Sequence, residues 1–268
     1  MLTYAWFFLA VSLNIDSVPP LLVVGTPEIP YRYQDETGEL KGIDIEIIQG
    51  VMQAMHFNYT IRLVPVGSRI IKMAQSGDVD IVLSFSKKSD RLAYLLYPKQ
   101  YYSLFTWNFF IRRDDAAHIK YQTLKDLESL RVGATQDWSY TEAFWSAPLN
   151  LHVETNNLLH IEKLLRNRID VVPMNTLPTL IELHQRGLNQ FISYLPKPLS
   201  SKAYYNPTSK FSTHPLLSKW RVNYDRLLYL WLKNGQVKAI YHRYFPKDII
   251  TDDLIPAPQA MEQTPTDN

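Results

Sequence analysis

Short apolar runs alternate with amphipathic stretches along the chain. Runs rich in Val, Ile and Leu that are bounded by Gly, Pro or polar residues predict strands. Stretches in which apolar residues recur every three or four positions predict helices. The predicted strands cover residues 21–24, 59–64, 80–85, 104–111, 130–134, 152–154, 169–174 and 191–195. The predicted helices cover residues 43–55, 69–75, 138–145, 158–165, 177–186, 216–233 and 237–244.

The order of these elements predicts two lobes. Alternating strands and helices pair in parallel through right-handed crossovers. The alternation restarts near residue 130 after a long aromatic strand, and no close sequence repeat links the two halves. The pattern therefore predicts an α/β protein with two lobes of similar construction.

The two ends of the chain differ from its body. Residues 1–13 are almost wholly apolar, which is the length of a secretory core and too short to span a bilayer. We predict a signal peptide over residues 1–17 and export, although no Lys or Arg precedes the apolar run. A buried first helix or strand is the alternative. The proline-rich, polar end predicts a disordered tail over residues 251–268.

Composition excludes several classes of function. The formal net charge is +2, with no basic run longer than two residues, so we expect no nucleic-acid partner. The chain has no cysteine, which excludes disulfides and thiolate chemistry. No nucleotide-binding, hydrolase or metalloprotease motif is present, and no two histidines stand four residues apart. We therefore expect no metal, no cofactor and no catalytic residue. The aromatic run at residues 101–110 is expected to pack in the core.

One segment carries candidate binding chemistry. A buried strand at residues 80–85 ends in hydroxyls at Ser84 and Ser86, and Arg91 follows five residues later. Side chains at the carboxyl ends of strands in open α/β sheets face the crevice where ligands bind. Arg91 can hold a carboxylate through two parallel hydrogen bonds, with the serine hydroxyls donating beside it. An ordinary loop with a surface arginine fits this spacing equally well.

Six blocks in order resemble the bacterial extracellular solute-binding proteins of family 3, the periplasmic amino-acid-binding proteins of ABC importers. The first blocks are Gly25-Thr26 with Pro30-Tyr31, the G-x-x-x-G-x-D-x-E stretch at residues 38–46, and the Ser76 to Arg91 segment. The later blocks are Asp126 to Gly133, the Arg168-Ile169-Asp170 strand, and Asn234-Gly235 with Tyr241 to Phe245. Together the blocks span residues 21–248.

The resemblance implies a bilobal periplasmic-binding-protein fold of type II, with two α/β lobes joined by a two-strand hinge. Lobe 1 would comprise residues 20–102 and 204–250, and lobe 2 residues 103–203. The two crossings would lie near Ser103 and Ser201. The ligand would be trapped by lobe closure.

The resemblance also implies roles for individual residues. Arg91 would bind the carboxylate of the ligand, helped by Ser86, with Ser84 on the same wall. Ser139 would add a hydroxyl at the start of a helix. Tyr31, or Trp138, would pack against the ligand side chain.

The sequence departs from the family where the ligand ammonium would be held. The acidic residue usual there corresponds to Asn175, which supplies no charge. Lys87 and Lys88 replace small residues. Either Glu28 or Asp137 would have to substitute as the ammonium partner, or the ligand is a carboxylate without an α-amine.

These features predict a non-enzymatic, monomeric periplasmic protein that captures an amino acid or a similar small carboxylate for an ABC permease. Two alternatives stay open. One is a solute sensor that reports to a membrane signalling protein. The other is a periplasmic enzyme similar to the cyclohexadienyl dehydratases, with Glu28 or Asp137 as general acid.

Overall fold

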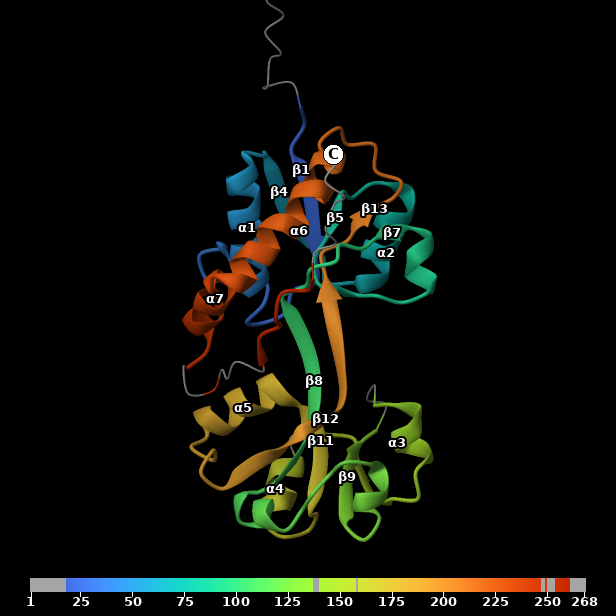
Figure 1. Cartoon of the computed structure of the whole chain (residues 1–268), viewed down its shortest axis with the longest axis vertical. Coiled ribbons are helices and arrows are strands. Elements are labelled where there is room, and N and C mark those ends of the chain that lie inside the picture. The colour runs from blue at the N-terminus through green and yellow to red at the C-terminus, as the bar shows by residue number, and fades with distance from the viewer. Residues whose placement is uncertain (1–17, 137–139, 158, 247–248, 250–253, 261–268) are drawn as a thin grey trace, which may run out of the picture.

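The fold is bilobal, with one α/β lobe above the other in Figure 1 and two long strands running between them. The structure is a computed structural model that describes residues 18–136, 140–157, 159–246, 249 and 254–260. Each lobe contains a sheet with helices packed on it. The predicted bilobal α/β class is therefore confirmed.

The upper lobe is built on a five-stranded sheet. In spatial order its strands are β4 (Tyr59–Leu63), β1 (Leu21–Gly25), β5 (Ile81–Val82), β13 (Thr208–Ser209) and β7 (Leu95–Leu96). The pairs β1–β4 and β1–β5 are parallel, whereas β13 is antiparallel to β5 and to β7. A small antiparallel pair, β2 (Tyr33–Gln34) with β3 (Leu40–Lys41), leads into the first helix.

Alternate residues of β1 reach opposite faces of this sheet. Leu21 and Val23 belong to one buried cluster and Val24 to another, as the two-residue period of a strand requires. The first face is covered by α1 (Ile43–Met55), α6 (Leu217–Lys233) and α7 (Gln236–Tyr244), which also contact one another. The second face is covered by α2 (Gly67–Ser76).

The lower lobe contains a six-stranded sheet. In spatial order its strands are β10 (Asn150–Glu154), β9 (Arg131–Thr135), β11 (Val171–Asn175), β8 (Ser103–Arg112), β12 (Ile192–Tyr205) and β6 (Phe85–Ser86). Its helices are α3 (Glu142–Ser146), α4 (Leu159–Leu165) and α5 (Thr176–Gln185). Short 3-10 turns cover Asp90–Ala93, Arg113–Ala117 and Leu124–Leu127. Phe109 and Phe110 are fully buried on opposite faces of β8, so this part of the aromatic run packs in the core as predicted.

The two connecting strands are β8 and β12, which pair in antiparallel fashion (Figure 1). The prediction ended the last strand at residue 195, before Pro196 and Pro198, and this was wrong because β12 continues to Tyr205. Register shifts lie on both sides of Pro198. Proline has no N–H to donate to the ladder, and a bulge accommodates it without ending the strand.

The predicted strand over residues 80–85 is divided. β5 ends at Val82 and β6 begins at Phe85, with Ser84 in the left-handed region at φ 56°. This conformation is uncommon outside glycine. It turns the chain out of the upper sheet, so that Phe85 and Ser86 pair with Tyr205 and Tyr204 of β12.

Part of the predicted tail has a defined path. Leu254 and Ile255 pack against the core, and Gln259 exchanges two hydrogen bonds with the buried Gln100 side chain, at 2.7 and 2.9 Å. Residues 251–253 and 261–268, like the predicted signal peptide at 1–17, lie outside the described residues.

Asn206 fixes the turn at Ser84. Its Oδ1 accepts the Ser84 N–H at 3.0 Å, and its Nδ2 donates to the hydroxyls of Tyr102 and Tyr224 at 3.2 and 3.1 Å. All four residues are buried. A buried donor or acceptor without a partner costs about 1–3 kcal/mol.

We therefore expect Asn206→Ala to lower the free energy of unfolding by about 2–4 kcal/mol, measured by urea denaturation. Asn223→Ala on α6 is the matched control, because its side chain only donates to the Lys219 carbonyl at the helix surface. This control should change stability by less than about 0.5 kcal/mol. Equal effects of the two variants would contradict the role given to Asn206.

Candidate functional site

The guanidinium of Arg91 is held beside β6. Arg91 lies in the turn at Asp90–Ala93, and its Nη1 donates to the Ser86 carbonyl at 2.9 Å and to the Ser86 hydroxyl at 3.2 Å. Its guanidinium carbon lies 4.6 Å from the centroid of the Phe85 ring, in a cation–π contact. Arg91 forms no ion pair with an acidic residue among those described. Its charge is thus fixed in position and free to meet an anion.

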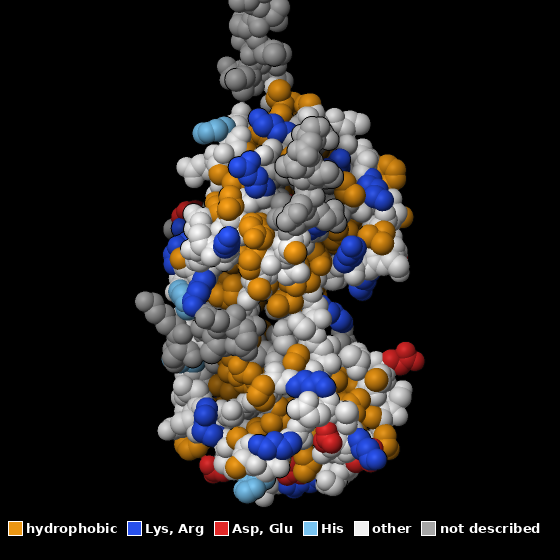
Figure 2. Space-filling model, in the orientation of Figure 1, with side chains coloured by type: hydrophobic (Ala, Val, Ile, Leu, Met, Phe, Trp, Pro, Cys, Tyr) orange, Lys and Arg blue, Asp and Glu red, His pale blue; other side chains and the backbone are white. Residues whose placement is uncertain are grey.

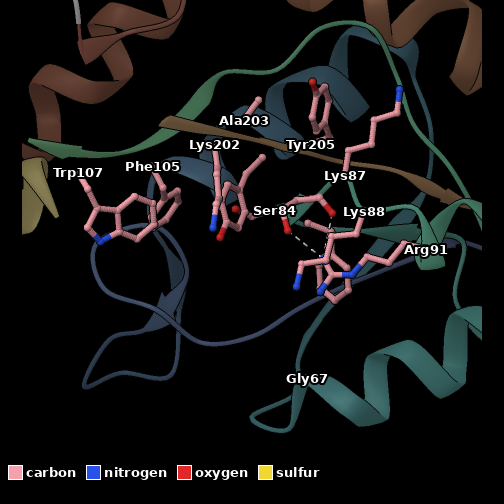
Figure 3. A pocket seen from close by; sticks show the side chains of 13 residues that line it. Gly67, Ser84, Lys87, Lys88, Arg91, Phe105, Trp107, Lys202, Ala203 and Tyr205 are labelled. Carbon is pink, nitrogen blue, oxygen red and sulfur yellow. Dashed lines mark hydrogen bonds between the residues drawn. The ribbon is translucent and has the colours of Figure 1, made fainter. Parts of the chain in front are cut away.

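A cleft of about 670 Å³ opens in front of Arg91. Figure 2 shows a notch between the two lobes, and Figure 3 shows the side chains that line the cleft. The lining residues are Gly67, Ser84, Phe85, Ser86, Lys87, Lys88, Arg91, Phe105, Trp107, Lys202, Ala203, Tyr204 and Tyr205. They come from the start of α2, from the junction at Ser84, β6 and the loop after it, and from the connecting strands β8 and β12. Three predicted site residues, Ser84, Ser86 and Arg91, therefore line one cleft.

Ser84 lines this cleft and carries a buried hydroxyl. The residue is only 8% exposed, and its Oγ has no hydrogen-bond partner among the described residues. Buried polar groups are nearly always hydrogen-bonded, so an exception in a cleft points to a ligand. The left-handed backbone at Ser84 is a second unusual feature of the same residue.

Aromatic rings form one wall of the cleft. Phe105 stacks on Tyr204 with ring centroids 4.4 Å apart, and Tyr31 lies behind Phe105 at 5.4 Å. Tyr31 is only 3% exposed and does not line the cleft. The ring of Tyr31 thus supports Phe105, and its contact with a ligand remains a prediction.

The hydroxyl of Tyr204 lies in the electric field of groups on two sides. Burial raises the pKa of Tyr204, and the negative charge of Glu28 raises it further. The positive charge of Arg91 and a hydrogen bond with Ser86 act in the opposite direction. The charges of both Arg91 and Glu28 therefore influence the Tyr204 hydroxyl.

Glu28 is already engaged by a cation. Its Oε2 accepts from Arg32 Nη2 at 2.6 Å, and the same guanidinium pairs with Asp44 and donates through Nε to the Thr26 carbonyl at 2.7 Å. Arg32 is 2% exposed and Asp44 is fully buried. Glu28 does not line the cleft. The prediction that Glu28 holds a ligand ammonium stays untested, and it would have to compete with Arg32.

The same cluster includes Asp44, which lies in the first turn of α1. The N-cap residue of this helix is Gly42, and the Asp44 carboxylate pairs with Arg32. Burial raises the pKa of Asp44 and of Glu28, and the charge of Arg32 opposes both shifts.

Asn175 lies in the lower lobe, beside a lining residue but not among them. It is the last residue of β11 and the N-cap of α5, and it is opposite Trp107 in the β8–β11 ladder. Its side chain makes no capping hydrogen bond and it does not line the cleft. Trp138 and Ser139, together with Asp137, lie outside the described residues.

Sequence reasoning missed part of the cleft. Phe105 and Trp107 belong to the buried core cluster, as predicted for the aromatic run, but they also line the cleft. Lys202 and Tyr204 carried no signal because β12 was predicted to end earlier. The two-residue alternation of Phe105, Trp107 and Phe109 shows that they share one face of β8. This alternation does not show that Phe105 and Trp107 lie at the end of that face which borders the cleft.

The sequence profile of the bacterial extracellular solute-binding proteins, family 3, matches residues 22–247. The match covers most of the chain, so the protein belongs to this family. The resemblance inferred from the six blocks is thereby confirmed. No curated protein sequence matches the chain.

Solved structures share the fold at low sequence identity. The L-cystine solute receptor of Neisseria gonorrhoeae, in an unliganded open conformation, has a TM-score of 0.70 and 15% identity, covering 87% of this chain and 95% of its own. Substrate-binding domain 2 of GlnP from Lactococcus lactis, also open, has a TM-score of 0.64 and 16% identity over 85% and 96%. A histidine kinase sensor domain has a TM-score of 0.55 and 20% identity over 86% and 98%. These likenesses establish the fold.

Among the described residues, none of the helices is long and apolar enough to cross a membrane. No group of three or more His, Cys, Asp or Glu side chains among these residues could hold a metal ion.

The raised pKa values of Glu28 and Asp44 predict a pH effect on stability. A carboxyl whose pKa is higher in the folded state keeps its proton to higher pH than in the unfolded chain, where the pKa is about 4. The free energy of unfolding then falls as pH rises from about 4 towards neutrality. Glu28→Gln removes one of these carboxyls, so the variant should gain stability relative to the original protein over this range.

Urea denaturation of both proteins at about pH 4 and about pH 7 measures this difference. Glu36→Gln, in the exposed turn between β2 and β3, changes the charge equally and is the control. A relative loss of stability by Glu28→Gln as the pH rises would show that the ion pair with Arg32 outweighs burial.

Proposed function

We propose that this solute-binding protein captures an amino acid or a similar small carboxylate between its two lobes and delivers it to an ABC importer. The observation that carries the proposal is Arg91, a guanidinium held by Ser86 and Phe85 at the wall of the cleft, with no described acidic partner. Bidentate pairing of a guanidinium with a carboxylate is among the stronger hydrogen-bonded contacts in proteins. Ser84 and Ser86 supply further donors beside it.

Capture would proceed by movement of the lobes about the β8–β12 ribbon. Lobe 1 comprises residues 20–102 and 204–250 in this proposal, and lobe 2 comprises residues 103–203. The ribbon supports this division because these two strands run between the lobes in Figure 1. Hinges of this kind absorb their dihedral changes in a few residues. Closure would bring the end of β11, with Asn175, towards the cleft.

Delivery to an importer implies export, so we propose a periplasmic location with residues 1–17 as signal peptide and a monomer as the working form.

A sensor role has one supporting observation, the similarity of the fold to a histidine kinase sensor domain. The enzymatic alternative is less favoured because the described lining residues include no carboxylate and no imidazole. A general acid must lie within hydrogen-bond reach of its substrate.

A thermal-shift screen of the protein with amino acids, keto acids, dicarboxylates and polyamines identifies the ligand class. A ligand at about 100 times its Kd adds about 2.7 kcal/mol, a shift of roughly 5–10 °C for a protein of this size. Arg91→Ala should weaken the binding of the best responder about tenfold to a hundredfold, measured by calorimetry.

Arg62→Ala is the control, because Arg62 is exposed on the edge strand β4. It should leave affinity unchanged. Retained affinity in a folded Arg91→Ala protein would remove Arg91 from the site and with it the basis of the proposal.

Lobe closure itself predicts a smaller radius of gyration with ligand than without. Small-angle X-ray scattering on the same sample, with and without the best responder, measures this change. An unchanged scattering curve at saturating ligand would show that the cleft binds without closing.

A further inference from the structure

Positive charge gathers in the cleft without a compensating acid. Four of its lining residues are cationic, namely Lys87, Lys88, Arg91 and Lys202. No described lining residue is acidic, and none of these four cations forms an ion pair with a described carboxylate. A cleft walled by one sign of charge concentrates ligands of the opposite sign. Arg91 alone can pair with a single carboxylate, so a ligand with one carboxylate would leave the three lysines without an anionic partner.

The cations stand at two separate places. Figure 3 shows Lys88 and Arg91 on one side of the cleft and Trp107 with Phe105 on the other, with Lys202 between them and nearer to the aromatic side. The first group belongs to the loop after β6, and the second belongs to β8 and β12. Lys202 is opposite Phe105 in the β8–β12 ladder, and its ammonium lies 5.5 Å from the centroid of the Trp107 ring.

Trp107 adds a donor at this second place. Its side chain is 9% exposed, it lines the cleft, and its indole Nε1 has no hydrogen-bond partner among the described residues. An indole N–H can only donate, so its missing partner must be an acceptor. On the Arg91 side, the Ser84 hydroxyl likewise has no hydrogen-bond partner among the described residues. Each side of the cleft thus combines a cation with a buried, unpartnered hydroxyl or N–H group.

The described residues of the cleft include no carboxylate that could pair with an ammonium group. Glu28 is paired with Arg32 and does not line the cleft, and Asn175 carries no charge. An ammonium placed beside Lys88, Arg91 or Lys202 would be repelled by like charge.

We infer that the ligand of this cleft is a small dicarboxylate, or an equivalent dianion, without an ammonium group. One acidic group binds Arg91 with Ser84 and Ser86, and the other binds Lys202 and the Trp107 indole, with the carbon chain against Phe105 and Tyr204. This inference rests on the proposed binding function and specifies its ligand class.

Matched probes distinguish the effect of a second carboxylate from the effect of an ammonium group. Glutarate has two carboxylates and no ammonium, 4-carbamoylbutanoate has one carboxylate and no ammonium, and L-glutamate and L-glutamine add the ammonium to each. Succinate, adipate, suberate and the three benzenedicarboxylates extend the range of spacing between the acidic groups. Calorimetry at low and moderate salt gives Kd for each probe. At least one dicarboxylate should bind at least tenfold tighter than its monoamide and than any amino acid tested.

Two lysine variants test whether Lys202 binds the second acidic group of the ligand. Lys202→Gln should weaken the best dicarboxylate about tenfold or more and change its monoamide by less than about twofold. Lys197→Gln is the matched control, since Lys197 is also on β12 and lies over an aromatic ring, Tyr121, at 5.8 Å, but outside the cleft. It should change neither affinity. Trp107→Phe keeps the aromatic packing and removes the donor, so it should act in the same direction as Lys202→Gln.

The outcomes distinguish this inference from the function it rests on. Arg91-dependent binding of a monocarboxylic amino acid, with no tighter dicarboxylate, would overturn the inference and leave the proposed function standing. If Asp137→Asn abolished that binding, Asp137 would be the ammonium partner. A dicarboxylate indifferent to both Lys202→Gln and Trp107→Phe would also overturn the inference. No detectable binding of any probe would count against both proposals.

Discussion

The antiparallel pairing of β8 with β12 joins the two lobes and sets the position of the cleft between them. These strands belong to the lower sheet, run between the lobes, and carry Phe105, Trp107, Lys202 and Tyr204 to the cleft. Because the ladder fixes their register, it also fixes which side chains share the cleft wall. β6 then adds to the edge of β12, which sets Ser86 opposite Tyr204. The upper lobe is therefore joined to the ribbon at the position of the candidate site.

The junction at Ser84 shows how local backbone and site are linked. The left-handed residue redirects the chain from the upper sheet to β12, and the Asn206 side chain satisfies its N–H. Backbone strain of this kind persists where surrounding contacts enforce it, and it is common at ligand sites. Its consequence is that Phe85 lies under the Arg91 guanidinium while the Ser86 carbonyl and hydroxyl hold Nη1. Arg91 is thus held in position by contacts within the protein, so binding need not order it.

Charge is distributed unevenly between the cleft and the core beside it. The cluster of buried Arg32 and Asp44 with the half-exposed Glu28 contains charges of both signs, whereas the charged residues of the described cleft lining are all cations. Within this cluster, Arg32 pairs with both carboxylates, so each charge has a partner of opposite sign. Unpaired cations along an open cleft stay partly solvated until a ligand replaces the water. The first arrangement suits the start of α1, and the second suits capture of an anion.

The amino-acid sequence alone was enough to predict the α/β class, most helices and strands, the family, and the Ser84 to Arg91 segment as part of the cleft. Periodicity and motif order reflect local preferences of backbone and burial, which is why α1 and β8 were predicted almost to their ends. Three features became visible only in the folded chain. They are the continuation of β12 past Pro196 and Pro198, the pairing of Asp44 with Arg32, and the place of Trp107 and Lys202 in the cleft. These features depend on which residues meet across a ladder or a core. A one-dimensional pattern shows that a side chain is apolar or charged, but its neighbours are set only when distant segments pack together.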